Sequence, residues 1–72
     1  MRLEQGKKYV AELALPFFVP VSVAVSQLRQ FGFRGVSSLR LASGVVEVRG
    51  TWDRPSAVVD LPPQIKRPRV EL

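Results

Sequence analysis

Apolar and polar residues alternate along residues 7–15, which read "KKYVAELAL". One set of alternate positions holds Tyr9, Ala11, Leu13 and Leu15, and the other holds Lys8, Val10, Glu12 and Ala14. A period of two is typical of a strand with one buried face. The pattern therefore predicts a strand whose Tyr9 side faces the core.

The next segment changes to the spacing of a helix. Apolar residues recur at Val21, Ala24, Val25, Leu28 and Phe31, with polar residues between them. This spacing predicts an amphipathic helix, although "VSVAV" by itself would also suit a strand. Either Pro20 lies in the first turn, or Ser22 caps a slightly shorter helix. Gly32 suits the left-handed conformation that ends a helix, with Phe33 folding back on the last turn.

Residues 34–52 predict a β-hairpin around a two-residue turn at Ser43-Gly44. That turn pairs Leu41 with Val46, Arg40 with Glu47 and Leu39 with Val48. Such a register places apolar pairs on one face and an ion pair on the other, and favourable cross-strand pairs stabilise a hairpin. Gly50 and Trp52 continue the apolar face, so Trp52 is expected to close one end of the core.

Prolines divide the remaining chain. Pro55, Pro62, Pro63 and Pro68 leave "AVVDL", residues 57–61, as at most a short edge strand. We therefore expect a compact domain over residues 1–61 and an extended, Pro-rich, basic C-terminal arm over residues 62–72.

The predicted order is strand, helix, strand, strand, which makes a small α+β domain. Its sheet has three strands, or four if 57–61 joins it, with one helix on one face. The helical crossover makes the first two strands parallel, and the hairpin adds an antiparallel neighbour. In element order the pattern resembles half of a ferredoxin-like fold, and no family motif accompanies that order.

Residues 13–28 carry no charge, which is compatible with a membrane segment, a secretion signal or a domain core. A spanning helix needs about 20 apolar residues, and Pro16 and Pro20 interrupt this shorter run. A signal peptide would explain Lys7, Lys8 and the small residues near Ser26, but Glu12 fits it poorly. We expect a core, no membrane span, no cleaved secretion signal, and a location in the cytoplasm or in a particle or assembly.

The chain has 72 residues, no Cys and no His. A domain of this size buries about 60% of the surface of its unfolded chain, so it commonly needs oligomerisation, a metal or disulfides. Disulfides and a zinc cluster are excluded by composition. Because one helix leaves the second sheet face uncovered, self-association through that face, through open edges or through the arm is expected. The interface prediction comprises Val10, Ala14, Val36, Val45, Ile65 and Val70.

Catalytic chemistry has little support in the sequence. There is no His base and no Cys nucleophile, and the six acidic residues form no cluster with ligand spacing. The two glycines of Gly32-Phe-Arg-Gly35 lack the rest of a phosphate-binding loop. We expect no enzyme, no catalytic or metal-binding residues, no cofactor and no small-molecule substrate.

The net charge of +5 favours an anionic partner. Phosphate contacts of a sequence-independent nucleic-acid-binding protein are predicted at Arg34, Arg40, Arg49, Lys66, Arg67 and Arg69. Exposed aromatic residues for base stacking are not predicted on the sheet. The expected function is therefore a structural, assembly or adaptor module that packs against a copy of itself or another protein, such as a subunit of a viral particle or bacterial assembly. Nucleic-acid binding is the alternative, and a toxin, antitoxin or inhibitor stays open.

Overall fold

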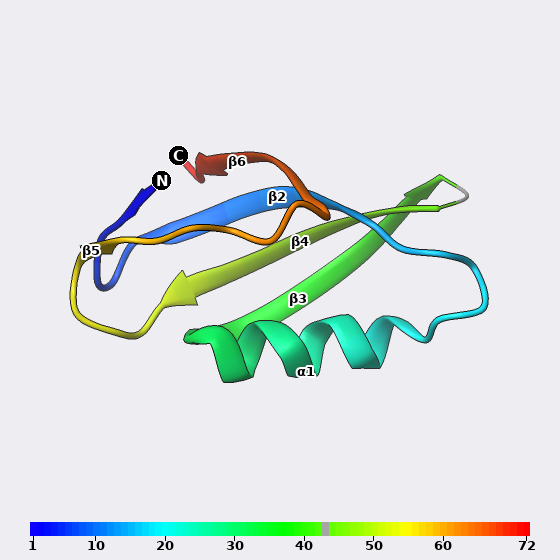
Figure 1. Ribbon diagram of the computed structural model, residues 1–72, viewed down its shortest axis with the longest axis horizontal. Helices are drawn as coiled ribbons and strands as arrows, with labels where there is room; N and C mark the ends of the chain where they lie inside the picture. The colour runs from blue at the N-terminus through cyan, green and yellow to red at the C-terminus, as the bar shows by residue number, and fades with distance from the viewer. Residues whose placement is uncertain (43) are drawn as a thin grey trace.

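The computed structural model describes residues 1–42 and 44–72, and it contains one helix and two β-sheets (Figure 1). The elements in chain order are β1 Arg2–Leu3, β2 Lys8–Ala14, α1 Val21–Phe31, β3 Phe33–Ala42, β4 Val45–Trp52, β5 Ala57–Val58 and β6 Ile65–Val70. The small α+β class with a single helix is confirmed. The predicted element order is not confirmed, because β1, β5 and β6 add strands at both ends of the chain.

The main sheet has four strands in the order β3-β4-β2-β6, and each neighbouring pair is antiparallel. Strands β2 and β3, which flank the helix in sequence, run in the same direction with β4 between them. Strands β1 and β5 form a separate two-stranded sheet that pairs Leu3 with Ala57. The segment 57–61 was expected to be at most a short edge strand, and its paired part is only two residues long.

Helix α1 begins directly after Pro20, which stands at the N-cap without a side-chain capping hydrogen bond. Ser22 therefore lies inside the helix and is not its cap. At the other end Gly32 has a φ of 136° and donates its N–H to the Leu28 carbonyl oxygen at 3.2 Å, so the predicted terminator is confirmed. The stacked rings of Phe31 and Phe33, with centroids 6.3 Å apart, show that Phe33 does fold back on the last turn.

Two groups of buried side chains form the core. The larger group consists of Ala11, Leu15, Ala24, Val46 and Val48, and the second of Leu3, Tyr9 and Trp52. Trp52 closes one end of the core as expected: it is 3% exposed and its ring contacts those of Phe31 and Phe33. The alternation predicted the inner side of β2 correctly.

The predicted hairpin register is wrong by one residue. Leu39 pairs with Glu47 and Arg40 with Val46, and the register shifts between Arg40 and Ala42. The bulge at Leu41 adds one residue to β3, and a shift of one residue turns the side chains beyond it to the opposite face. Leu39 therefore lies on the face of Glu47 and is 60% exposed. Ser43 of the predicted turn lies outside the described residues.

The extended Pro-rich tail is not confirmed, because residues 65–70 form β6 at the edge of the main sheet (Figure 1). Pro68 is tolerated there since an edge strand has one side without hydrogen-bonding partners. Arg67 has a φ of 51°, and the β2–β6 register is irregular between Val10 and Glu12. Strand β6 pairs with β2 within the main sheet, and the domain boundary expected at residue 61 stays a prediction.

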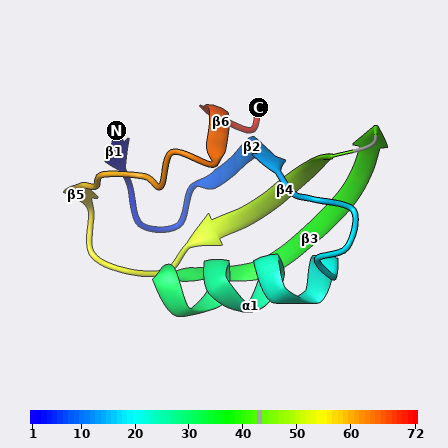
Figure 2. The same ribbon diagram turned by 45° about the vertical axis from the view of Figure 1, so that its right-hand side comes forward.

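Helix α1 covers only part of the sheet. It packs beside β3, as the two views of the ribbon agree (Figures 1 and 2). A helix with side chains is about 10 Å wide. Four strands spaced by about 4.8 Å span about 14 Å between the axes of the edge strands. The side of the sheet formed by β2 and β6 therefore lies beyond the helix, where Leu3, Leu61 and Ile65 cover part of it.

Candidate interaction surfaces

The face of the main sheet that points away from α1, here called the outer face, is mostly charged. Neighbouring strands place Arg49 and Arg69 on either side of Val10, and Lys66 beside Glu12. Val10 is only 6% exposed, although no helix covers it. Long arginine side chains can cover apolar surface with their aliphatic parts while keeping the charge in water, which accounts for this burial.

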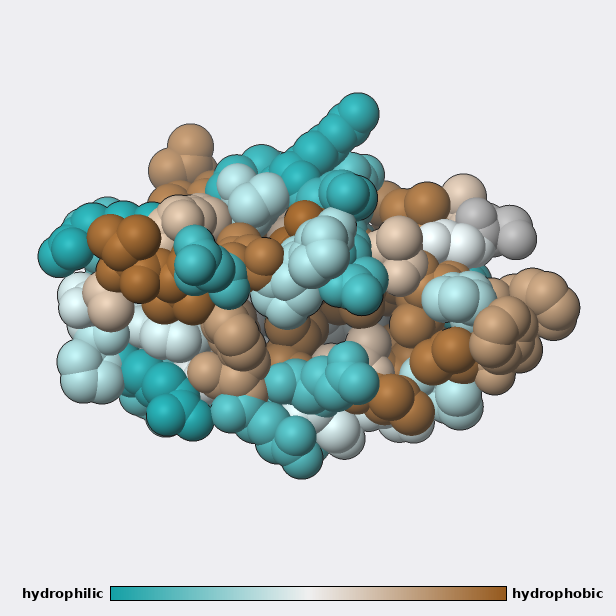
Figure 3. Space-filling model, viewed as in Figure 1, coloured by the Kyte–Doolittle hydropathy of each residue, from teal (hydrophilic) through white to brown (hydrophobic). Residues whose placement is uncertain are grey.

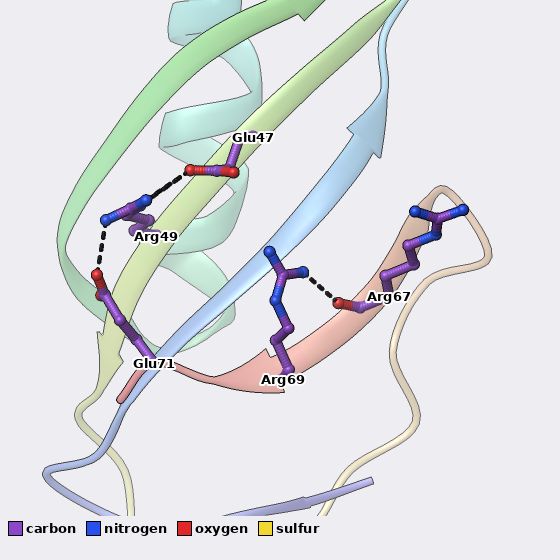
Figure 4. Close-up of polar contacts among 5 residues, drawn as sticks. All are labelled: Glu47, Arg49, Arg67, Arg69 and Glu71. Carbon is purple, nitrogen blue, oxygen red and sulfur yellow. Dashed lines mark hydrogen bonds and ion pairs between the residues drawn. The ribbon is translucent and has the colours of Figure 1, made fainter.

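Arg49 lies at the centre of an ion-pair network on the outer face (Figure 4). It donates hydrogen bonds to Glu47 Oε1 at 2.8 and 3.0 Å and to Glu71 Oε1 at 2.6 Å. The hydrogen bonds to Glu47, followed by the negative charge of Glu71, raise the pKa of the Arg49 guanidinium. This arginine is therefore already neutralised by two carboxylates from its own chain.

A second set of contacts joins β6 to β2. Arg67 Nε lies 3.5 Å from Glu12 Oε2, and Arg69 donates a hydrogen bond to the Arg67 carbonyl oxygen at 3.0 Å (Figure 4). The Arg67 side chain is 80% exposed, so solvent screens its ion pair. These contacts position the cations of β6 along one edge of the sheet.

The residues predicted to bind anions are not gathered at one site. Arg34 pairs with Asp53 at 3.5 Å, and Arg49 and Arg67 have the acidic partners described above. Within residues 1–42 and 44–72, Arg40, Lys66 and Arg69 form no ion pair. Arg40 lies on β3 and the other two on β6, at opposite edges about 14 Å apart across the sheet.

The residues predicted as an interface are divided between the two faces. Val10, Ala14 and Val45 share the outer face, where Ala14 and Val45 are register partners. Val36 instead approaches Gly50 on the helix side: its Cγ2 lies 3.3 Å from the position that a Gly50 Cβ would occupy. Ile65 packs against the core, and Val70 pairs with Tyr9. The bulges of β3 and the pairing of β6 cause this division.

The uncovered part of the helix face forms a groove of about 610 Å³ between α1 and β2, here called the α1 groove. Its lining contains no charged residue and consists of Leu13, Ala14, Leu15, Pro16, Val19, Val23, Ala24, Gln27, Leu28, Gln30, Phe31, Pro62, Gln64 and Ile65. The groove lies between α1 on one side and the end of β2 with residues 62–65 on the other. Apolar side chains from these three segments are open to solvent along it.

Two phenylalanines project from the loop at one end of the α1 groove. Phe17 is 82% exposed and Phe18 is 73% exposed, with ring centroids 5.7 Å apart in an edge-to-face arrangement. Val19 donates its N–H to the Pro16 carbonyl oxygen at 3.0 Å, which closes a tight turn around the two rings. The central residues of such a turn point outward. Apolar side chains gather at this end of the molecule in the space-filling view (Figure 3).

In the sequence these two phenylalanines border the predicted helix, and the sequence analysis assigned them no function. The segment "PFFVP" carried a usable signal, because closely spaced prolines predict a turn and a turn exposes its central residues. The α1 groove had no comparable signal. It depends on how far one helix extends across the sheet and on β6, which the sequence did not predict.

Comparisons of the chain with protein-family models, with curated proteins and with solved structures find no match. None of the helices that the structure describes is long and apolar enough to cross a membrane. Function is therefore inferred from the surfaces of this chain.

Proposed function

We propose that this protein is a non-enzymatic interaction module, an assembly subunit or adaptor that docks another protein surface through Phe17, Phe18 and the α1 groove. The observation that carries the proposal is the position of two exposed aromatic rings beside a groove without charged lining. A contiguous apolar surface of this kind is typical of protein interaction sites. Aromatic residues are also the side chains most often found as energetic anchors of interfaces.

The charged outer face has a different role in this proposal. Its arginines are partly satisfied by Glu12, Glu47 and Glu71, so they gain less from an external partner than free cations do. We propose that the outer face contacts solvent and helps to orient the partner. The α1 groove then provides the binding affinity. A subunit of a viral particle or bacterial assembly is one setting in which such a module operates.

The test compares two matched variants of the full chain expressed in its own host. Complexes are isolated at about 50 mM and about 200 mM salt, a range over which phosphate-driven binding falls steeply. We expect a salt-resistant protein complex that is lost in Phe17→Ser/Phe18→Ser and kept in Lys66→Gln/Arg69→Gln. Its composition is read by native mass spectrometry, and a complex equally present in both variants contradicts the proposal.

Nucleic-acid binding is the second candidate, favoured by the positions of Lys66 and Arg69 on β6. Neither side chain forms an ion pair in the part of the chain that the structure describes, so both are available to phosphate. This candidate predicts that bound nucleic acid is released at about 200 mM salt and by Lys66→Gln/Arg69→Gln. Fluorescence anisotropy with single- and double-stranded oligonucleotides measures it.

A further inference from the structure

We infer that the occupant of the α1 groove is a second copy of this chain, in a twofold dimer that inserts Phe17 and Phe18 of each copy into the groove of the other. The inference rests on the proposed function and specifies its partner. In a twofold interface the same surface patch serves both copies, so it must carry both the projecting group and the site that receives it. The loop 15–20 and the α1 groove meet this requirement because they are adjacent on one molecule.

Because its lining is uncharged, the α1 groove suits contact between two identical cationic chains. Two copies each carry a net charge of +5, so most of their surfaces repel one another. The lining of the α1 groove and the two phenylalanines contribute no charge to the contact. A dimer through this patch keeps Lys66, Arg67 and Arg69 of both copies in solvent.

The length of the groove matches a reciprocal arrangement. Helix α1 has 11 residues and is therefore about 16 Å long. Pro16 and Val19 line one end of the groove, and Phe31 lines the other. An antiparallel approach places the rings of the second copy toward the Phe31 end, while its own groove receives Phe17 and Phe18.

The area available agrees with a weak or moderate dimer. A phenylalanine side chain buries about 150–250 Å² when it is covered, so the two exposed rings offer about 300 Å² for each copy. Four rings in a dimer contribute about 600 Å² and the two groove linings add a smaller area, so the contact has the size typical of a weak or moderate dimer. The accessible surface of one chain is 4741 Å², so the contact would use a small fraction of it.

The sheet edges are weaker sites for self-association. Strand β6 carries Pro68 and three cations, features that oppose pairing with another edge. Strand β3 is interrupted by register shifts between Arg34 and Ser37 and between Arg40 and Ala42, which leaves residues 37–40 as its longest stretch in regular register. Exposed Leu39 and Leu41 make β3 the competing site, and the experiment separates it from the groove.

The experiment measures the mass of the purified full chain by sedimentation equilibrium, with no other protein present. Chain concentrations run from about 1 µM to about 1 mM, the range that covers weak and moderate dimers. We expect twice the 8.0 kDa of one chain at high concentration, at low and high salt alike. Phe17→Ser/Phe18→Ser should raise the dissociation constant at least about 100-fold, as expected for loss of aromatic anchors. Circular dichroism and amide NMR spectra verify that each variant is folded.

Matched variants locate the contact. Gln27→Arg places a charge in the α1 groove and should weaken the dimer, whereas Ser26→Arg adds the same charge to an exposed helix position outside the groove and should not. Val58→Ser removes an apolar side chain that is 74% exposed on β5 and should leave the mass unchanged. Leu39→Ser/Leu41→Ser tests the β3 edge and should also leave it unchanged.

Mixing two defective variants tests the reciprocal contact directly. The Phe17→Ser/Phe18→Ser chain keeps an intact groove, and the Gln27→Arg chain keeps intact phenylalanines. Together they restore one of the two contacts, so the mixture should form a heterodimer that neither chain forms with itself. Any one of three results overturns the inference. They are loss of the dimer in Leu39→Ser/Leu41→Ser, persistence of the dimer in Phe17→Ser/Phe18→Ser, and absence of a heterodimer in the mixture.

A wild-type chain that stays monomeric throughout the concentration range also overturns self-docking. The proposed function is decided separately by the complexes isolated from the host. A salt-resistant complex that depends on Phe17 and Phe18, found together with a monomeric purified chain, refutes the dimer and retains the interaction module. Absence of both results refutes the two proposals together.

Discussion

The two faces of the main sheet differ in the side chains that they expose: charged groups on the outer face and apolar groups on the helix face. On the outer face, Arg49 lies between the carboxylates of Glu47 and Glu71 (Figure 4). Arg67 approaches Glu12, so these two arginines are paired within the chain. On the helix face, α1 covers the core beside β3 and leaves apolar side chains of β2 and β6 next to an open groove. We propose that affinity for a partner resides on the helix face, because the apolar side chains that line the α1 groove are open to solvent.

The largest expected effect on stability comes from Trp52, which is buried on the helix face. Trp52→Ala should lower the free energy of unfolding by about 3–5 kcal/mol, the usual cost of removing a buried aromatic ring. Trp52 is 3% exposed, contacts two phenylalanine rings and donates its indole N–H to the Pro55 carbonyl oxygen at 3.2 Å. Urea unfolding monitored by circular dichroism measures the change. Trp52→Phe should cost less, and equal losses for the two variants would contradict the packing argument.

A smaller effect is expected where α1 meets β3. Gly32→Ala should destabilise the protein by about 1–3 kcal/mol, since the φ of 136° strains a residue with a side chain. The added Cβ would also lie 2.9 Å from the Trp52 ring. Gly35→Ala is the control, because Gly35 has a φ of 58° but nothing within 4 Å of its Cβ position. Thermal unfolding should rank Gly32→Ala as the more damaging change, and the reverse order would contradict the close approach.

The outer face should tolerate loss of its central cation. Arg49→Gln removes ion pairs whose arginine is 50% exposed, and exposed pairs contribute little because solvent screens them. We expect a shift in the unfolding midpoint smaller than that of Gly32→Ala, and a further decrease of that shift at high salt. A change as large as that of Trp52→Ala would show that the network supports the fold and is not merely solvated.

The smallest expected effect concerns pH at the turn between β1 and β2. The hydrogen bond and charge of Lys7, 2.6 Å away, hold the pKa of the Glu4 carboxyl below its ordinary value of 4.5. A lowered folded pKa means that the pair stabilises the fold above the unfolded pKa and that this contribution is lost as pH falls through the folded pKa. Glu4→Gln should therefore lower stability slightly at neutral pH and reduce its decline below pH 4.5. Equal pH profiles for the variant and the wild type would contradict the pairing.

The elements that the sequence predicted best are those with a strong local pattern. Strand β2 and helix α1 were recognised because burial of one face imposes a period that is visible in the sequence. Gly32 and Trp52 were also placed correctly, since a helix terminator and a large aromatic have few alternative roles. The hairpin was recognised, but its register was not, because the bulge at Leu41 leaves no mark in the alternation of residues 35–42.

The structure of the C-terminal segment and the presence of the α1 groove depend on contacts between residues distant in sequence. The local sequence pattern therefore did not predict them. Residues 65–70 read as an extended arm because Pro68 and three cations oppose a strand within a sheet, yet they pair with β2 at its free edge. That pairing widens the sheet to four strands. The predicted interface residues were divided between two faces for the same reason, since the side that each residue occupies depends on register.

The sequence by itself determined the small α+β class, one helix, a thin core, and the exclusion of disulfides and a Cys- or His-based zinc site. These conclusions follow from composition and from periods of two and 3.6 residues, which burial imposes on each element separately. Only the tertiary structure decided the register of β3, the place of β6, the pairing of Arg49 and the presence of the α1 groove. Each of these depends on which strand becomes the neighbour of another, and local spacing along the chain does not specify that choice.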